Sequence, residues 1–418
     1  MGLLESRFRA QMAKNKNPKH DEASADILYS TGFLPLDFLN GIKVHGTLPN
    51  GETFSYNNIG IVDGSANQFI GRSGSGKTTI AIQAAANIIR PFKDAVMFFD
   101  DIEASSNITR RELLTRFTPE ELESRVIYRN SAITAENFYE RIEFIYEEKM
   151  SHKDEYEYNT GLLDSRGNEI YKLIPTVYLL DSLAMLTPDK VSEAEDLGGQ
   201  MSATAMAKTN TAVFKRIIPK LKAANIILMT INHINDKIEI NAFVHTKAQI
   251  GFLKQNETLP GGKAALYLAN NMIRVDDGAV LKDSEGLGVY GRIVEFSFVK
   301  SRTNASGKSV PMVFTFDHGF DEILSIFIFL KSVGAIELKG SSCTLRGHED
   351  MKFSQKNFKE KLLSDEKFAT AFNMVAKEEL EKLLSKPGDV DVDVYAKQQN
   401  IVNSILSLWP TSNKNRRK

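Results

Sequence analysis

The sequence predicts an α/β protein in which a mainly parallel sheet is flanked by helices. From residue 64 onward, short apolar runs alternate with segments of helical period, the pattern of a parallel sheet covered on both faces. Residues 71–78, GRSGSGKT, satisfy every fixed position of Gly-x-x-x-x-Gly-Lys-Ser/Thr, a phosphate-binding loop that joins a strand to a helix. The 418 residues provide ample material for a buried core of this kind.

The expected elements follow from this periodicity in chain order. In the first part of the sheet we expect strands at 68–71, 95–100, 176–181 and 225–232, and helices at 79–89, 112–124, 135–149 and 202–223. After residue 264 the chain becomes strand-rich, with strands expected within 264–275, 291–300 and 310–317. Two segments interrupt the alternation: 42–63 indicates a hairpin or an elaborated loop, and 151–170 an insertion or hairpin.

Three regions are expected along the chain. Residues 1–29 form an N-terminal amphipathic helix and a polar linker, and residues 30–335 form the α/β core. Residues 336–418 are charged and helical in pattern, which predicts a small α-rich C-terminal domain. Its basic end, NKNRRK, serves either as a solubilising tail or as a contact to duplex DNA.

Composition limits the function classes. The net charge is −1, so no global basic excess indicates a nucleic-acid binder, and such binding would need a local patch. The single cysteine, Cys343, excludes an intrachain disulfide and suits a reducing cytoplasm. No run approaches the roughly 18 apolar residues of a membrane span, and the N-terminus lacks the apolar segment of a signal peptide. We expect no membrane partner.

The glycine-rich loop predicts a nucleotide site that binds ATP with Mg²⁺. Glycines let backbone N–H groups turn toward phosphates, and the following helix adds the positive end of its dipole. Lys77 should bridge the β- and γ-phosphate oxygens, and the Thr78 hydroxyl should ligate Mg²⁺. The predicted ATP-binding residues are Gly71, Arg72, Ser73, Gly74, Ser75, Gly76, Lys77, Thr78 and Thr79, together with Arg110 farther along the chain.

Acidic residues at strand ends supply the rest of the predicted chemistry. Asp181 follows four apolar residues, so it should lie at the carboxyl end of a strand as the second metal ligand. Asp100, Asp101 and Glu103 end the strand after the loop helix, and any of them could be a solvated turn acid. The spacing favours Glu103 as the base that activates water.

Several longer segments resemble the RecA superfamily of recombinases, most closely the phage UvsX-type members. The similar segments are STGFLPLDFLNG (30–41), FDDIEA (99–104), LLDSLAMLTP (179–188), TINHIND (230–236), LPGGKAALYLANNMIRV (259–275) and FVKSRTNASGKS (298–309). They cover roughly 30–335 in the family's motif order. The resemblance implies a RecA-like P-loop ATPase core with Glu103 as the catalytic carboxylate, and an N-terminal segment that contacts a neighbouring protomer.

The resemblance also implies roles for residues outside the loop. His233 occupies the position that senses the γ-phosphate, although a satisfied core histidine is the plainer alternative. Lys300 and Arg302, taken as lying on one face of a strand, would reach the ATP of a neighbouring subunit; otherwise they are solvated edge charges. Arg110 aligns near the place where the family often stacks adenine on a tyrosine, which departs from the family's pattern.

Two loops next to the phosphate-binding loop would hold DNA. The loop at 234–262 combines basic and aromatic residues, which single-strand binding needs for phosphates and bases. The alternative is an insertion with scattered lysines. The loop at 187–201 is acidic but carries small residues that could approach DNA. The predicted DNA-binding residues are Lys237, Phe243, Lys247, Phe252, Lys254, Gly261 and Gly262 in the longer loop, and Gly198, Gly199 and Met201 in the shorter one.

Together these features predict an ATP-dependent DNA recombinase in the cytoplasm of a bacterial cell or a phage-infected host. It would form a helical filament of its own copies on single-stranded DNA, pair that DNA with a homologous duplex and exchange strands. Such a DNA-dependent ATPase would also meet a loader and a single-strand-binding protein. The alternatives are a RecA-like hexameric helicase, a non-catalytic recombination mediator and, least supported, a small-molecule P-loop kinase.

Overall fold

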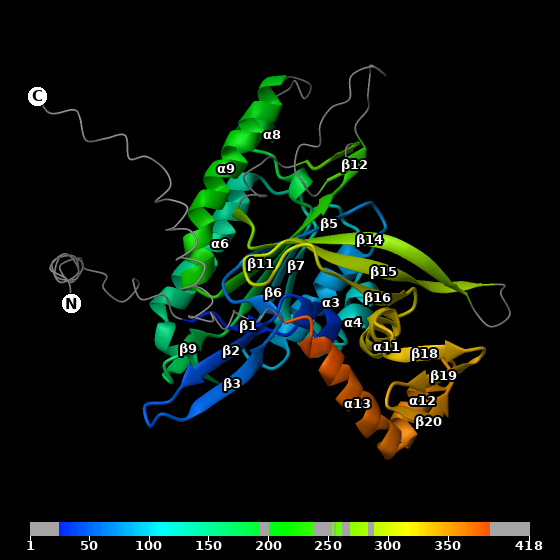
Figure 1. Cartoon of the computed structure of the whole chain (residues 1–418). Helices are drawn as coiled ribbons and strands as arrows, with labels where there is room; N and C mark the ends of the chain where they lie inside the picture. Colours follow the sequence, from blue (N-terminus) through cyan, green and yellow to red (C-terminus); the bar gives the residue numbers. More distant parts are fainter. Residues whose placement is uncertain are drawn as a thin grey trace, which may run out of the picture.

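A computed structural model describes residues 25–192, 200–236, 253–254, 256–260, 268–282 and 288–384. The predicted N-terminal helix and the basic tail lie outside these residues. Within them, the chain forms an α/β fold around one nine-stranded sheet (Figure 1). None of the helices in this described part is long and apolar enough to pass through a bilayer.

The central sheet is mainly parallel, as predicted. Its order is β17-β16-β15-β14-β5-β11-β10-β6-β7, with parallel pairing from β14 to β7 and antiparallel pairing from β14 to β17. This arrangement is compatible with a RecA-like core. The strands are β5 (Ala66–Gly71), β6 (Met97–Asp101), β7 (Val126–Arg129), β10 (Thr176–Asp181), β11 (Ile226–His233), β14 (Asn271–Lys282), β15 (Val289–Lys300), β16 (Ser309–Thr315) and β17 (Gly319–Asp321).

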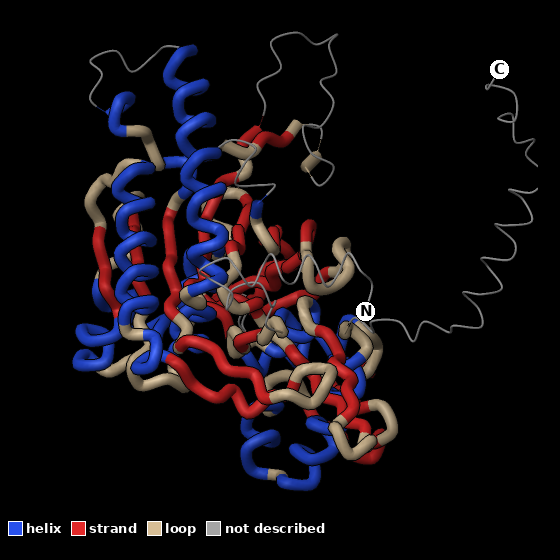
Figure 2. The backbone as a smooth tube through the Cα atoms, turned by 90° about the vertical axis from the view of Figure 1, so that its left-hand side faces the viewer, coloured by secondary structure: helices blue, strands red, loops and turns tan. Residues whose placement is uncertain are grey.

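Helices cover both faces of the sheet because its buried strands are apolar on both sides. In β10, Tyr178 and Leu180 pack into one apolar cluster, while Val177 and Leu179 pack into another. The first cluster contains α6 (Ala135–Ser151) and α9 (Gln200–Ala223); the second contains α2 (Leu34–Leu39), α3 (Lys77–Ile89) and α11 (Glu322–Ser332). A quarter-turn of the molecule shows helices standing beside the strands (Figure 2).

The prediction of one continuous helix over 112–124 is wrong. The structure has two helices there, α4 (Ile108–Thr115) and α5 (Pro119–Arg125). Arg116 adopts a left-handed conformation with φ of +54°, which ends α4. Thr118 then caps α5 in a reciprocal capping box with Glu121, and Pro119 occupies the first turn, where its missing N–H costs nothing.

Both segments that interrupt the alternation contain hairpins. The first joins β2 (Ile42–Thr47) to β3 (Thr53–Asn58), and β4 (Ile61–Val62) then pairs with β1 (Leu28–Tyr29). The second joins β8 (Glu157–Leu163) to β9 (Glu169–Leu173) after the short α7 (Lys153–Tyr156). Shorter elements line the carboxyl edge of the sheet: the 3₁₀ turn η2 (Leu183–Met185), α8 (Asp189–Ser192), β12 (Asn235–Asp236) and β13 (Glu257–Thr258).

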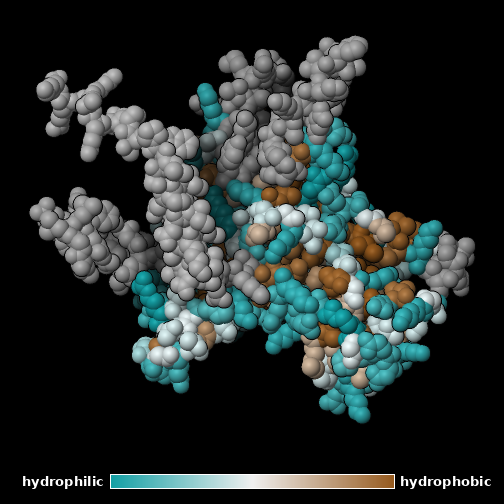
Figure 3. All heavy atoms as spheres, in the orientation of Figure 1, coloured by the Kyte–Doolittle hydropathy of each residue, from teal (hydrophilic) through white to brown (hydrophobic). Residues whose placement is uncertain are grey.

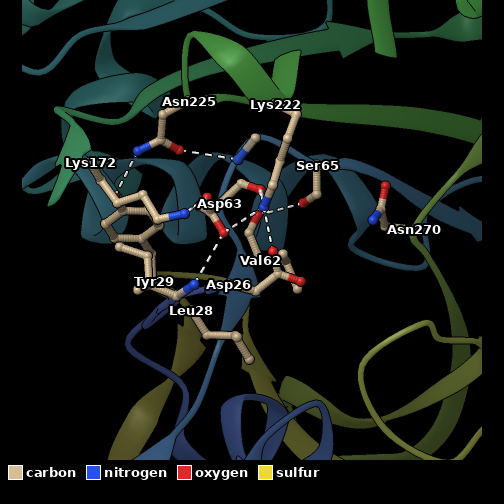
Figure 4. Close-up of polar contacts among 12 residues, drawn as sticks. Asp26, Leu28, Tyr29, Val62, Asp63, Ser65, Lys172, Lys222, Asn225 and Asn270 are labelled. Carbon is tan, nitrogen blue, oxygen red and sulfur yellow. Dashed lines mark hydrogen bonds and ion pairs between the residues drawn. The ribbon is translucent and has the colours of Figure 1, made fainter. Parts of the chain in front are cut away.

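A buried ionic cluster ties the second hairpin to the rest of the core. Lys172 of β9 and Lys222 of α9 both contact the buried carboxylate of Asp63, at 2.7 Å and 3.0 Å (Figure 4). Asp63 also accepts the backbone N–H of Ile27 at 3.1 Å. Buried charges persist only when paired and hydrogen-bonded, so this cluster fixes the hairpin at the edge of the sheet opposite the phosphate-binding loop.

The region beyond residue 335 contains the expected helices, but it also contains strands that the sequence did not predict. It begins with a three-stranded antiparallel sheet and ends with two helices: β18 (Ile336–Lys339), β19 (Ser342–Leu345), β20 (His348–Phe353), α12 (Phe358–Ser364) and α13 (Glu366–Glu381). Phe327 of α11 packs its ring against Phe353 and Phe358, with centroids 6.3 Å and 4.8 Å apart. These residues belong to the same apolar cluster as the central sheet, so the described part of this region shares the main core.

Lys149 of α6 should make the stability of the protein depend on pH. It is 2% exposed and donates to the Ile174 carbonyl and the Thr176 hydroxyl; burial lowers its pKa to about 7. Between pH 7 and 10.5, the unfolded state therefore holds a proton that the native state lacks, so this lysine makes stability rise with pH in that window. Lys149 should raise the free energy of unfolding by up to about 1.4 kcal/mol for each pH unit in this window, and Lys149→Met should remove this increase. Urea unfolding at pH about 7 and about 9 measures this. The exposed Lys153→Met serves as control, and an unchanged pH slope in Lys149→Met would contradict the assignment.

Candidate nucleotide site

The strand order brings the predicted site residues to one edge of the sheet. Residues 71–78, the predicted phosphate-binding loop, follow β5, and His233 at the end of β11 lies in register with Gly71. On the next strands, Asp181 at the end of β10 lies in register with Asp101 of β6. Because these strands are parallel, their carboxyl ends meet where α/β sheets bind ligands.

The loop has the backbone that a phosphate cradle requires. Gly74 and Gly76 have φ of +76° and +94°, a conformation that side chains other than glycine rarely adopt. A Cβ atom on Gly71 would lie 2.3 Å from the Val275 carbonyl oxygen, so the β5–β14 approach also requires glycine there. Lys77 starts α3, is 3% exposed and donates to the Arg72 carbonyl at 2.7 Å. The backbone of the loop at Arg72 thus accepts a hydrogen bond from the lysine that follows the loop.

Thr78 and Asp181 lie together, as the predicted metal ligands should. The Thr78 hydroxyl donates to Oδ2 of Asp181 at 2.6 Å. Oδ1 of Asp181 is buried and accepts no hydrogen bond from the described residues. A buried carboxylate oxygen beside a threonine hydroxyl fits the oxygen ligands that Mg²⁺ prefers. Burial raises the pKa of Asp181 to about 7, and Glu103 and Asp101 raise it further while Thr78 and Lys77 oppose the shift.

The three candidate acids after β6 have different surroundings. Asp100 pairs with Arg141 and accepts the hydroxyl of Tyr178, so it faces the α6 side of the sheet. Asp101 accepts the Ser106 N–H at 2.8 Å and so holds the turn that follows β6. Only Glu103 of these three contacts another predicted site residue, because its Oε1 lies 2.9 Å from Nε2 of His233.

His233 lies at the surface of the site. Its side chain is 25% exposed, and the next residue, Ile234, donates its N–H to the Gly71 carbonyl at 3.0 Å. The backbone after β11 is therefore joined directly to the phosphate-binding loop.

Two further arginines approach the loop from within the chain. Arg110 of α4 donates to the Thr79 hydroxyl at 3.2 Å, and burial lowers its pKa. Arg292 of β15 donates to the Gly74 carbonyl, and it pairs with Asp277 at 3.0 Å. Burial lowers the pKa of Lys77 to about 8, while Asp181, Glu103 and Asp277 oppose this shift. No sequence motif contains Asp277 or Arg292. The antiparallel pairing of β14 with β15 brings these two residues to the glycine-rich loop.

An ion pair links the loop to the start of the long predicted DNA-binding loop. Arg72 makes two bonds to Asp236 of β12, at 2.9 Å and 2.7 Å. Asp236 pairs in register with Glu257 of β13, whose carboxylate takes two bonds from Arg274 of β14. Residues on both sides of the segment 237–252 are thus joined to the sheet and the phosphate-binding loop. Asp236 ends the segment TINHIND but was given no role from the sequence, and no motif contained Glu257.

Lys300 and Arg302 lie away from the phosphate-binding loop of their own chain. Lys300 ends β15 level with Met272 and, through β14, with Gln68. Arg302 lies beyond the strand, so the expectation that both share one strand face is wrong; its N–H donates to the Asn270 carbonyl. Asn270 in turn bonds Ala66 at the start of β5. Five residues of strand, about 16 Å, separate Ala66 from Gly71, and three residues, about 10 Å, separate Gln68 from Gly71.

Most of the predicted DNA-binding residues lie outside the described part of the chain. These are Lys237, Phe243, Lys247, Phe252, Gly261 and Gly262 of the longer loop and Gly198 and Gly199 of the shorter one. Met201 lies in the first turn of α9. Lys254 is exposed, and its N–H donates to Glu257 at 2.9 Å, so this one lysine stands beside the paired strands β12 and β13.

At one carboxyl edge, then, the sheet presents a glycine-rich loop, a buried lysine, a threonine–aspartate pair and a glutamate–histidine pair. Compared with models of protein families and with curated proteins, the sequence gives no match to either.

Proposed function

We propose that this chain is an ATP-dependent DNA recombinase, which forms filaments on single-stranded DNA and exchanges strands with a homologous duplex. The observation that carries the proposal is the convergence of Lys77, Thr78, Asp181, Glu103 and His233 at one edge of the sheet. Each has the chemical group that its proposed role requires.

The roles follow from position and chemistry. Bound ATP with Mg²⁺ would supply a phosphoryl group whose charge the metal helps to neutralise. Lys77 would leave the Arg72 carbonyl to bind phosphate oxygens, and Thr78 and Asp181 would hold the metal. Glu103 would orient and deprotonate the attacking water. His233 would give up its hydrogen bond with Glu103 and form one with the γ-phosphate.

The proposed coupling to DNA rests on the connections around Asp236. Phosphates entering the loop compete with Asp236 for Arg72, because both offer oxygens for a bidentate guanidinium contact. The backbone after His233 leads into β12, the short strand that contains Asp236. Nucleotide binding would therefore change the contacts that hold β12, from which the long predicted DNA-binding loop begins. ATP would favour the DNA-bound form by differential affinity for the two states.

Self-association is also part of the proposal. Val280, Val289, Tyr290 and Phe316 are more than a third exposed, and apolar atoms are visible at the surface over β14 to β16 (Figure 3). Clustered apolar surface of this kind is typical of contacts between proteins. A second copy would be one proposed partner; a loader and a single-strand-binding protein would be others.

ATP turnover with and without single-stranded DNA tests the proposal. Turnover should rise at least about tenfold with the DNA, and DNA affinity should fall at least about tenfold between roughly 50 and 200 mM salt. Electron micrographs with ATP and DNA should show filaments. Rings that unwind duplexes without pairing homologous strands would instead indicate a helicase, and turnover indifferent to DNA would refute both.

A further inference from the structure

Three side chains from three different strands meet at the carboxyl edge of the sheet. Glu103 follows β6, Asp181 ends β10 and His233 ends β11. One carboxylate oxygen of each acid and one ring nitrogen of the histidine all lie within 4.8 Å of one another. Ligands in a tetrahedral arrangement are about 3.4 Å apart at metal–ligand distances near 2.1 Å. Shifts of up to about 1.4 Å would therefore bring the three groups to the spacing that one ion requires.

Asp181, one of the three residues of this cluster, has a buried side-chain oxygen without a hydrogen-bond partner among the described residues. Asp181 is 1% exposed, and Thr78 occupies only its Oδ2 atom. Its Oδ1 has no hydrogen-bond partner among the described residues. A buried polar atom in this condition costs free energy unless something satisfies it, and a cation does so for a carboxylate.

The charges around the cluster also favour a cation. Glu103 and Asp101 both act on Asp181 as like charges, and Lys77 is the opposing charge nearby. Lys77 already donates to the Arg72 carbonyl, away from a direct bond to either acid. Glu103 and His233 are 31% and 25% exposed, so an ion can reach them and both side chains can adjust.

The ligand set distinguishes between classes of ion. Mg²⁺ prefers oxygen ligands and retains water. An imidazole nitrogen with two carboxylates suits Zn²⁺, Co²⁺ and related transition-metal ions. We propose that Glu103, Asp181 and His233 bind a divalent transition-metal ion directly in the nucleotide-free protein, and that this ion holds the site inactive.

The inhibition, unlike the binding, rests on the proposed ATPase function. An ion held by Glu103 would block its carboxylate from activating water. The same ion would hold His233 away from a γ-phosphate. Inhibition would therefore be relieved by nucleotide with Mg²⁺ in excess, because binding of the two is mutually exclusive.

Cobalt titration of the nucleotide-free full chain tests the site. Co²⁺ bound to nitrogen and oxygen gives a visible absorption band, which should saturate at one ion per chain and survive a large excess of Mg²⁺. His233→Gln can still contact Glu103 but lacks the imidazole ligand, so its Co²⁺ affinity should fall at least about tenfold. His45→Gln removes an exposed histidine of β2 and should bind Co²⁺ like the wild type.

Several results would overturn the proposal. Unchanged Co²⁺ affinity in His233→Gln would do so, as would displacement of Co²⁺ by equal amounts of Mg²⁺. Glu103→Ala provides a second variant, with the same expected loss, should His233→Gln fail to fold. ATP binding with Mg²⁺ is measured on cobalt-free samples of the same proteins. Cobalt binding without ATP binding would keep the metal site and remove the proposed function, and the reverse result would remove the metal site alone.

Discussion

Glu103→Gln should lower DNA-stimulated ATP turnover by about 10²- to 10⁴-fold while ATP affinity changes little, which is the usual cost of losing a general base. Glutamine retains the size of glutamate and can still contact Nε2 of His233, so the surrounding contacts persist. What it loses is the ability to accept a proton from water. The effect should therefore appear in the rate of turnover and not in binding.

Single-turnover kinetics and equilibrium ATP binding on the same variant make the measurement. Glu123→Gln, an exposed residue of α5, is the matched control and should retain full turnover. Full activity in Glu103→Gln would exclude its role as base. A loss confined to ATP affinity would instead make Glu103 part of the binding site.

The parts of the fold that follow local pattern were accessible from the sequence. β10 occupies 176–181 as predicted, because an apolar run between polar turns can only be a buried strand in this setting. Asp181 followed from that strand and lies beside Thr78. The link between Glu103 and His233 was not visible, because it depends on which strands are neighbours in the sheet.

Other features escaped prediction for two reasons. Local signals in the sequence can conflict, and the contacts of a strand depend on its pairing with strands far away in the chain. Residues 112–124 have helical periodicity throughout, yet Thr118 and Pro119 together start a new helix. The charged segment after residue 335 contains the expected helices α12 and α13, but the three strands before them escaped prediction. Gly340 and Gly347 adopt left-handed conformations that allow the two tight hairpins joining these strands. Arg292 reaches Gly74 only through the register of β14, β15 and β5.

The position of Lys300 permits a sharper test of assembly. Its register places it level with Gln68 in the middle of β5, three residues before Gly71 of the same chain. Burial and the neighbouring Arg302 lower its pKa to about 8, so holding its charge there costs free energy. In the proposed filament, this charge would act on the ATP of an adjacent copy. We expect Lys300→Ala to abolish turnover and to leave ATP binding by the single chain intact.

Mixing two inactive variants separates action within one chain from action between chains. Lys77→Ala should lose ATP binding at its own site but still present Lys300 to a neighbour. Lys300→Ala keeps its own loop intact and lacks only the donated lysine. In a random equal mixture of head-to-tail copies, about one junction in four combines an intact loop with an intact lysine. Turnover should therefore recover to about a quarter of the wild-type rate.

The mixture distinguishes the two modes of action of Lys300. If Lys300 acts within its own chain, no ratio of the two variants should restore ATP turnover. Lys339→Ala, an exposed lysine of β18, should be fully active alone and controls for the loss of a surface charge. Recovery should also require DNA, since the junctions form in the filament. If Lys300→Ala lost ATP binding as well as turnover, the lysine would belong to its own site and the trans role would be excluded. Recovery of turnover in the mixture, with ATP binding intact in Lys300→Ala, would mean that Lys300 acts on the nucleotide site of a neighbouring copy.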